Sequence, residues 1–193
     1  MQKIKFSGEV WFTSDLHLHH RRIQEFCPFT RKGTDVDDMT ARILDNILTT
    51  LRPKDTLINL GDFSFGTPTQ TRDALKMIRD NGIKHHIVFG NHDHYMRGSE
   101  EHLSFFETTN DDVTFTFNKN VFVCHHFPKA SWDRMMYGSY HLHGHTHGDY
   151  STEGRIMDVG IDTRAAGDMK PYHIEEIVKI LSPEPFGSHH KRK

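Results

Sequence analysis

Cysteine is scarce in this chain of 193 residues, where Cys27 and Cys124 are the only two and lie far apart. This spacing does not indicate a disulfide framework, so we expect two reduced thiols and a cytoplasmic protein. No apolar stretch approaches the roughly 18 residues that a membrane-spanning helix needs. No apolar signal-peptide core follows the first residues, Met1 to Lys5. We therefore expect a soluble chain without a membrane partner.

The chain also lacks an excess of charge of either sign. It carries 24 Lys and Arg against 26 Asp and Glu, a formal net charge of −2. Such a balance provides no general attraction to nucleic acid or to an anionic membrane. The length fits one globular domain, which we place at residues 1–181, followed by a mobile basic tail over 182–193. No internal repeat or linker interrupts the domain.

Histidine, in contrast, is abundant, with 17 residues. Most of them follow short apolar runs that have the composition of buried strands. In α/β proteins, functional sites form at the carboxyl ends of the strands, so these side chains are expected to converge. The metal-binding side chains at the run ends are Asp15, His17, Asp62, Asn91, one of His125 and His126, His145 and His147.

The first half of the sequence alternates between strand and helix patterns. Strands are predicted over 9–14, 56–60 and 85–89. The helix between the first two begins near a capping-box pattern at Thr34–Asp37 and stops before Pro53. The helix between the last two begins at Thr67–Pro68 and ends at Asn81–Gly82. This β-α-β-α-β order favours a layered α/β core with parallel strand pairing.

The second half is rich in strand patterns. A hairpin is predicted from strands over 113–117 and 121–124, and further strands over 139–142 and 156–161. Ser99 is predicted to cap a short helix that runs through Phe106, and a final amphipathic helix over 174–181 is predicted after Pro171.

Seven candidate ligands are more than one metal ion requires, because a structural zinc site is filled by four. Two ions about 3.5–4 Å apart would use all seven, with one carboxylate bridging them. Nitrogen and oxygen ligands without thiolate suit manganese, iron, zinc, cobalt or nickel. Two divalent ions and two aspartates leave a site charge near +2, which would attract a phosphate group and stabilise a bridging hydroxide as nucleophile.

A leaving alkoxide needs a proton, and His92 is the candidate general acid because it adjoins a ligand without being needed as one. Asp93 is the nearest carboxylate that could support His92 as an acid. Three further residues are candidates for substrate binding. His20 could face the substrate or cap a helix, Arg21 could bind phosphate or be an exposed loop charge, and His143 could face the site or pack.

Five sequence blocks resemble the signatures of the calcineurin-like metallophosphoesterases, in particular a small bacterial and phage branch. The blocks are Asp15-x-His17, Gly61-Asp62, Gly90-Asn91-His92-Asp93, His126-x-Pro128 and Gly144-His145-x-His147. The resemblance covers roughly residues 9–181 and implies a four-layer α/β/β/α sandwich with two mixed β-sheets.

The resemblance also implies how the two metal ions are held. Asp15, His17, Asp62 and His147 would hold one ion, and Asp62, Asn91, His126 and His145 the other. His126 is chosen over His125 because the family pattern is His-x-Pro, and His92 would be the general acid. Manganese is the favoured ion.

We predict a phosphodiesterase that acts on a small nucleotide or cyclic nucleotide. A phosphodiester carries less charge than a monoester, so a metal pair and one acid suffice for it. The alternatives are a phosphomonoesterase, a nuclease for DNA or RNA and, least favoured, a non-catalytic scaffold. A nuclease would need a basic groove for the polymer backbone, whereas the basic residues here are scattered.

Overall fold

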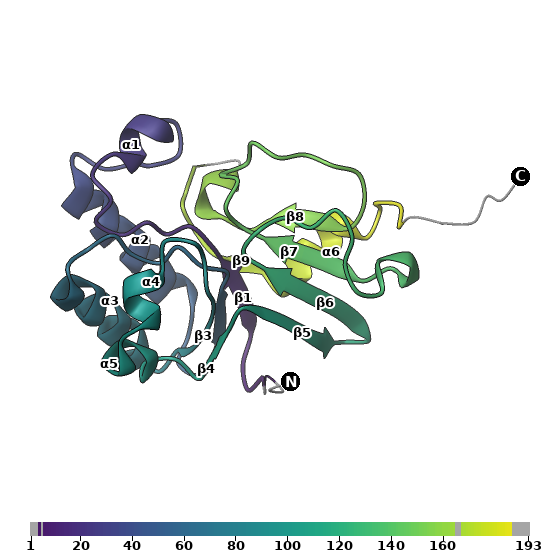
Figure 1. Ribbon diagram of the computed structural model, residues 1–193, viewed down its shortest axis with the longest axis horizontal. Coiled ribbons are helices and arrows are strands. Elements are labelled where there is room, and N and C mark those ends of the chain that lie inside the picture. The colour runs from purple at the N-terminus through teal and green to yellow at the C-terminus, as the bar shows by residue number, and fades with distance from the viewer. Residues whose placement is uncertain (1–3, 5, 165–166, 187–193) are drawn as a thin grey trace, which may run out of the picture.

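The computed structural model describes residue 4, residues 6–164 and residues 167–186, and its strands form two sheets (Figure 1). The first sheet has the order β4-β3-β2-β1-β9 and the second the order β5-β6-β7-β8. Each sheet mixes parallel and antiparallel pairs. The predicted α/β class with two mixed sheets is confirmed.

The parallel core of the first sheet follows the predicted alternation. Strands β1 (Val10–Thr13), β2 (Thr56–Asn59) and β3 (Lys84–Val88) pair in parallel. Helix α2 (Val36–Thr50) connects the first two strands and helix α3 (Pro68–Asp80) the last two.

The starts of these two helices differ in how well the sequence predicted them. Helix α3 has the expected cap, because the Thr67 side chain accepts from the Gln70 amide and Gln70 completes a capping box. Helix α2 is capped differently from the predicted box at Thr34. The Asp35 carboxylate accepts hydrogen bonds from the amides of Asp37 and Asp38.

The second sheet begins with the predicted hairpin, β5 (Asp112–Phe117) and β6 (Asn120–His125), and continues with parallel β7 (Tyr140–His143) and β8 (Ile156–Asp158). Strand β8 is shorter than predicted, because the chain turns into the short helix η2 (Ile161–Thr163). Two very short strands escaped the sequence analysis. They are β4 (Thr108–Asn110) and β9 (Tyr172–His173), which complete the first sheet at its two edges.

The remaining helices are short. They are α1 (Ile23–Phe26), α4 (His94–Arg97), α5 (Glu100–Leu103), η1 (Met135–Tyr137) and α6 (Ile174–Leu181). Ser99 caps α5 as predicted, by accepting from the His102 amide. Among the described helices, none combines the length and the apolar character needed to cross a membrane.

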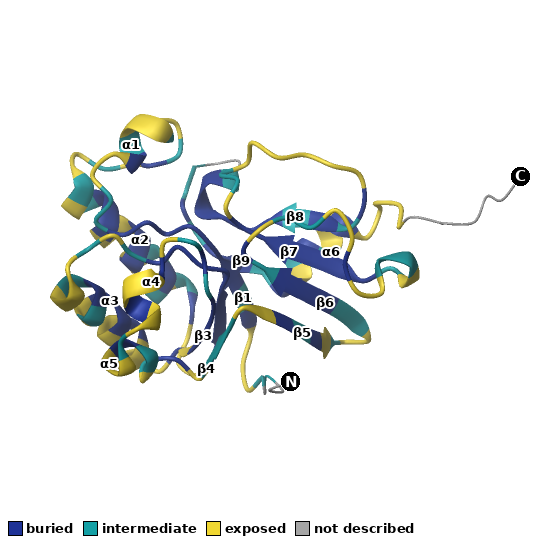
Figure 2. Cartoon of the chain, viewed as in Figure 1, coloured by how far each residue is buried: buried dark blue, intermediate teal, exposed yellow. Residues whose placement is uncertain are grey.

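Two apolar cores hold the layers together, and the strands between them are buried (Figure 2). One core lies between helices α2 and α3 and one face of the first sheet, and includes Ile43, Ile47 and Leu75. The other lies between the sheets, where Phe12 stacks on Phe122, and it also includes the buried face of α6. On the far side of the second sheet, Trp132 from the segment that leads into η1 packs in a small separate cluster.

The segment after α6 is attached to the domain rather than free. The Arg155 guanidinium donates to the Ser182 carbonyl oxygen at 3.2 Å and lies 4.7 Å from the centroid of the Phe186 ring. Residues 182–186 thus contact the domain, and the mobility expected from residue 182 onward stays a prediction. The basic end of the tail, 187–193, lies outside the described residues.

Candidate metal centre

The predicted ligands come from the ends of five strands, and backbone hydrogen bonds connect the loops that carry them. The Asp15 amide donates to the Gly61 carbonyl oxygen at 2.9 Å, which joins the loops after β1 and β2. The His145 amide donates to Asp15 Oδ2 at 2.8 Å, which joins the loop after β7 to the loop after β1. The two sheets therefore present their loops to one common site.

Five of the seven predicted ligands adopt left-handed backbone conformations, which residues other than glycine rarely do. Their φ angles are 54° for Asp15, 47° for His17, 55° for Asp62, 71° for His145 and 48° for His147. Such strain costs about 1–3 kcal/mol per residue and is concentrated at functional sites. The strain at these ligands indicates a site whose geometry is imposed by the surrounding fold.

The first group of ligands comprises Asp15, His17 and His147. His17 Nε2 lies 3.7 Å from Asp15 Oδ1, and His147 Nε2 lies 4.0 Å from the same oxygen. Asp15 Oδ1 and His17 Nε2 are both buried and have no hydrogen-bond partner among the described residues. Metal–ligand bonds of about 2.0–2.2 Å place two ligand atoms roughly 3–4 Å apart, so these unpaired atoms fit a shared cation.

The second group comprises Asp62, His126 and His145, with Asn91 beside them. His126 Nε2 lies 3.5 Å from Asp62 Oδ2 and 2.9 Å from Asn91 Oδ1. The other ring nitrogen of His126, Nδ1, donates to the Leu60 carbonyl oxygen at 2.7 Å, which directs Nε2 into the site. His125 instead contacts the backbone of Phe127 at 3.0 Å, so His126 is the member of this pair that joins the group.

Asp62 lies between the two groups. Its Oδ2 atom is 3.6 Å from His17 Nε2 in the first group and 3.5 Å from His126 Nε2 in the second. Its other oxygen accepts a hydrogen bond from the His92 amide at 2.8 Å, which holds the carboxylate in this orientation. One carboxylate therefore faces both groups, as a bridging ligand must.

The electrostatics of the two groups favour a cation. Asp15 and Asp62 are buried, and neither forms an ion pair with Lys or Arg in the part of the chain that the structure describes. Burial lowers the pKa of His17 to about 4, so its ring is neutral and able to bind a metal ion. Burial also raises the pKa of Asp62, and the nearby negative charges of Asp15 and Asp93 add to this effect. A bound cation would relieve this repulsion between carboxylates.

A network behind His147 was not predicted from the sequence. His147 Nδ1 donates to Asp162 Oδ2 at 2.7 Å, which leaves Nε2 facing Asp15. Burial opposes the charged form of both groups, but their mutual hydrogen bond prevails, so the pKa of His147 rises to about 10 and that of Asp162 is lowered to about 2. Cys27 Sγ lies 3.9 Å from the same ring nitrogen.

Arg31 completes this network from a fully buried position. Its guanidinium donates to both oxygens of Asp162, at 2.8 and 2.6 Å. It also donates to the carbonyl oxygens of Asp15 at 2.5 Å and Leu16 at 2.7 Å. Arg31 therefore holds in place both the loop that carries Asp15 and the Asp162 carboxylate that pairs with His147. In the sequence, Arg31 is one of several scattered basic residues and nothing local distinguishes it. Asp162 could have been found, because it directly follows the predicted strand 156–161, just as Asp15 follows the first predicted strand.

Comparison with known proteins identifies the family of this chain. Residues 8–163 match the calcineurin-like phosphoesterase family. The chain belongs to this family. It is also similar to the Gene 66 proteins of two mycobacteriophages, with 33% identity over 86 residues for phage L5 and 29% over 182 residues for phage D29.

These similarities differ in extent. The L5 match covers 45% of this chain and 40% of the relative, whereas the D29 match covers 80% and 88%. Among solved structures, a protein of unknown function from Aquifex aeolicus superposes with a TM-score of 0.69 and 22% identity. That match covers 91% of this chain and all of the other, and at this identity it supports the shared fold alone.

In this phosphoesterase, the side chains of His92 and Asp93 have different surroundings. His92 extends over the ligands with its side chain 46% exposed and its Nε2 atom 4.0 Å from Asp62 Oδ2. Asp93 is buried, and its carboxylate accepts from the backbone amides of Asp62, Phe63 and Gly90 at 2.7–3.0 Å. The Asp93 oxygens therefore hold the ligand loops together, and support of the His92 ring by Asp93 stays a prediction.

The three candidate substrate-binding residues have different positions in the phosphoesterase. His20 Nδ1 lies 3.3 Å from His17 Nδ1, and the His20 ring stacks on Phe65 with 4.1 Å between the ring centroids. Arg21 is exposed and forms no hydrogen bond or ion pair with the residues that the structure describes. His143 is buried, and its Nδ1 donates to the Gly144 carbonyl oxygen at 2.8 Å. Of the three, only His20 contacts a ligand ring.

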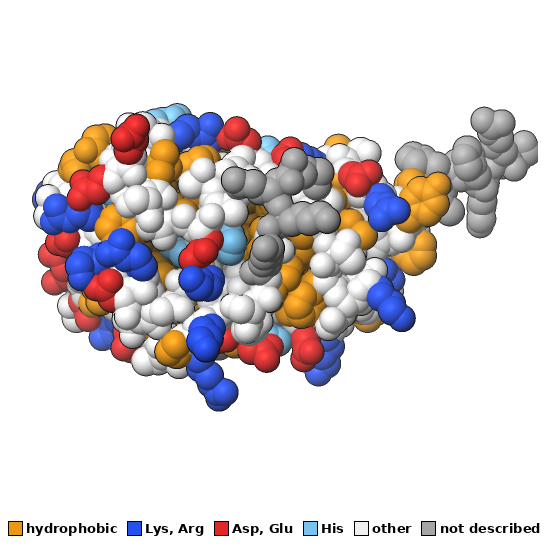
Figure 3. Space-filling model, turned by 90° about the horizontal axis from the view of Figure 1, so that it is seen from below, with side chains coloured by type: hydrophobic (Ala, Val, Ile, Leu, Met, Phe, Trp, Pro, Cys, Tyr) orange, Lys and Arg blue, Asp and Glu red, His pale blue; other side chains and the backbone are white. Residues whose placement is uncertain are grey.

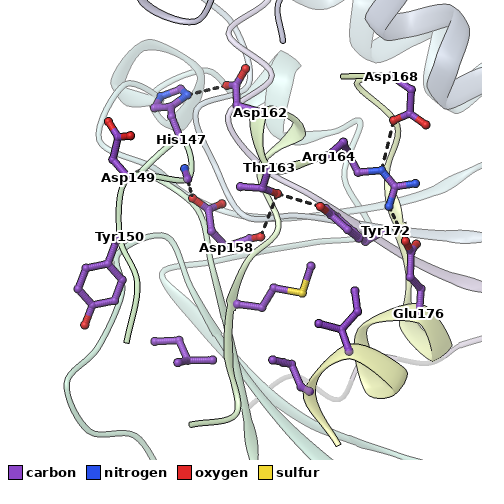
Figure 4. Close-up of a pocket in the computed structure, with 15 residues that line it drawn as sticks. His147, Asp149, Tyr150, Asp158, Asp162, Thr163, Arg164, Asp168, Tyr172 and Glu176 are labelled. Atoms are coloured by element: carbon purple, nitrogen blue, oxygen red, sulfur yellow. Dashed lines mark hydrogen bonds and ion pairs between the residues drawn. The ribbon is translucent and has the colours of Figure 1, made fainter. Parts of the chain in front are cut away.

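A cavity of about 790 Å³ opens beside His147 (Figure 4). Most of its charged side chains are already engaged with other protein groups. Asp158 accepts from the Thr146 hydroxyl at 2.7 Å, and Arg164 forms ion pairs with Asp168 and Glu176 at 3.3 and 2.7 Å. The cavity therefore enlarges the space next to the ligands but presents no unpaired basic group to a phosphate.

Proposed function

We propose that the protein is a metal-dependent phosphodiesterase that hydrolyses small phosphate diesters, with nucleotides as the substrate class. The observation that carries this proposal is the position of Asp62 Oδ2, 3.6 Å from His17 Nε2 and 3.5 Å from His126 Nε2. This placement supports a pair of ions that share one carboxylate.

The residues fit two divalent cations. Asp15, His17, Asp62 and His147 would hold one ion, and Asp62, Asn91, His126 and His145 the other. When bound, such ions supply Lewis-acid polarisation of the phosphoryl group and lower the pKa of water toward about 7. Because the donor set contains imidazole, carboxylate and amide groups, we expect manganese first, with iron, zinc, nickel or cobalt as alternatives.

His92 is suited to protonate the leaving group. Its ring is half exposed above the ligands, at 4.0 Å from Asp62, and its backbone amide is tied to the same carboxylate. In the proposed reaction water loses a proton to the solvent and its oxygen forms a bond to phosphorus, the bond from phosphorus to the leaving oxygen breaks, and His92 gives that oxygen a proton, which it regains from the solvent. The products are an alcohol and a phosphomonoester.

The distribution of charged side chains favours a small diester over a long nucleic-acid polymer as the substrate. The face seen from below in Figure 3 mixes basic and acidic side chains. Near the ligands, the Arg31 guanidinium is buried against Asp162, and Arg164 is paired with Asp168 and Glu176. A nuclease that follows a polymer backbone would be expected to use a continuous basic groove. A small diester needs no such groove.

The test is hydrolysis of bis-p-nitrophenyl phosphate and p-nitrophenyl phosphate by metal-stripped protein reloaded with Mn²⁺. We expect faster turnover of the diester, and a loss of about 100-fold or more in Asn91→Ala, whose amide belongs to the second ligand group. His92→Ala should have a small effect on this good leaving group and a loss of about 10²–10⁴-fold with a nucleoside leaving group.

Exposed Asn81 caps the end of α3, where its side-chain amide donates to the Met77 carbonyl oxygen at 2.9 Å. Asn81→Ala is the matched control, and it should cost some stability but leave turnover within about twofold, because Asn81 contacts no ligand. Faster turnover of the monoester would contradict the diester preference. Two bound ions without hydrolysis of either ester, or of nucleotide diesters, would contradict the proposed function.

A further inference from the structure

Two exposed phenylalanine rings flank the ligand groups, and they carry an inference about the substrate. We propose that Phe65 and Phe127 are stacking surfaces for the two bases on either side of the scissile phosphate, so that the substrate is a linear dinucleotide unit. This inference rests on the proposed phosphodiesterase function and specifies its substrate.

Phe65 lies on the side of the first ligand group. It follows Asp62 in the loop after β2, and its ring stacks on His17 with 5.0 Å between centroids and an interplanar angle of 16°. It also stacks on the His20 ring at 4.1 Å and lies 4.8 Å from the ring of His92. The residue is 39% exposed despite these contacts. Part of an aromatic surface, held in place by a ligand ring, therefore remains open beside the proposed acid.

Phe127 lies on the side of the second ligand group. It follows His126 in the loop after β6, and its ring centroid is 5.0 Å from that of His126 and 4.4 Å from that of His145. It is 40% exposed. Because Asp62 separates His17 from His126, the two phenylalanines lie next to opposite ends of the site.

Two exposed aromatic rings on either side of a phosphate site fit a substrate that carries nucleobases. A half-exposed phenylalanine beside a buried charged site leaves apolar area in water, and a flat aromatic partner would cover that area. Base stacking on aromatic side chains contributes to nucleic-acid binding without selecting one base, since every base has a π-face. Two surfaces on either side of one phosphate match two bases joined by one diester. A cyclic mononucleotide has only one base and would use one surface.

The experiment compares three diesters with Mn²⁺-loaded protein: the linear dinucleotide ApA, the same diester with both bases removed, and a cyclic adenosine mononucleotide. The variants are Phe65→Ala, Phe127→Ala, the conservative Phe65→Tyr and Phe127→Tyr, and Tyr137→Ala. Tyr137 is an exposed aromatic residue on η1 that contacts no ligand and serves as the matched control. Thermal unfolding of each variant verifies that it is folded.

Alanine at either phenylalanine should lower the ratio of kcat/KM for ApA to that for the abasic diester by about 5- to 150-fold, mainly through KM. Tyrosine should retain most of the ratio, because its ring still stacks, and Tyr137→Ala should not change it. For the cyclic mononucleotide, only one of the two alanine variants should lower kcat/KM strongly.

An equal rate of wild-type protein on ApA and on the abasic diester would overturn the inference and leave the phosphodiesterase function intact. A ratio that is unchanged in both alanine variants would overturn it in the same way. Failure to hydrolyse any diester with both ions bound would overturn the proposed function as well.

Discussion

The buried guanidinium of Arg31 offers a direct test of how the fold holds the first ligand group. Arg31 donates four hydrogen bonds, two to the Asp162 carboxylate and two to the carbonyl oxygens of Asp15 and Leu16. Arg31→Lys keeps the charge but replaces a planar fork of donors by a single ammonium group. Lysine cannot reach all four acceptors at once, so the substitution separates charge from geometry.

The expected magnitude follows from the bonds that are lost. A hydrogen bond to a charged group contributes about 1.5–3 kcal/mol, and two of the four should be lost in Arg31→Lys, which predicts a destabilisation of about 3–6 kcal/mol. Arg31→Met should cost at least as much, because it leaves a buried carboxylate without its cation. A domain near the middle of the typical range of about 5–15 kcal/mol for the unfolding free energy should still fold as the lysine variant.

The functional effect should be confined to one metal ion. Asp162 orients the ring of His147, and loss of such a supporting interaction typically weakens metal binding by about 10- to 100-fold. We therefore expect calorimetric titration of Mn²⁺ into the metal-stripped lysine variant to show one weakened site and one unchanged site. Urea unfolding of the metal-free protein measures the stability, because bound metal would add to it.

Arg42→Lys is the matched control, since Arg42 forms an exposed ion pair with Asp38 on α2, and such pairs contribute at most about 1 kcal/mol. If Arg31→Lys lost stability yet bound both ions as the wild type does, Arg31 would be structural only. If neither property changed, the four hydrogen bonds would not exist in solution.

Three further predictions concern pH, the ligand loops and close packing. Burial lowers the pKa of His85 to about 3, and neither ring nitrogen has a hydrogen-bond partner among the described residues. The unfolded chain binds this proton below about pH 6.5 and the folded chain does not, so the protein loses stability as the pH falls from about 6.5 toward 3. The stability gain of His85→Leu in urea unfolding should therefore grow by about 2 kcal/mol between about pH 7.5 and pH 5, and a constant gain would refute the assignment. Asp93→Asn should lower the free energy of unfolding by about 2–3 kcal/mol, because the carboxylate accepts three amide hydrogen bonds. The difference in hydrolysis rate between good and poor leaving groups, which reports on His92, should be the same in this variant as in the wild type. In Gly144→Ala the new methyl group would collide with the carboxylate of Asp15, so diester turnover should fall about 10²-fold, and a fully active variant would show that the loop moves freely.

The sequence determined the alternation of the first three strands with two helices and the β5–β6 hairpin. It did so because buried strands and amphipathic helices have local periodicities, and because turns and caps use particular residues at particular positions. It also indicated Asp15, Asp62 and Asn91 as members of one site, because the ends of parallel strands meet at one edge of a sheet. Short edge strands such as β4 and β9 had too few residues to show any period.

Only the tertiary structure decided which groups pair within the site. Arg31 and Asp162 are 131 positions apart in the chain, and no local pattern encodes a pair that packing brings together. Asp93 adjoins His92 in sequence, yet its oxygens face the backbone of the loop after β2. Composition and order thus determined which chemistry the chain carries. The hydrogen bonds that orient each ligand were decided by packing between the sheets, because a buried polar group takes whichever partner the folded backbone brings within reach.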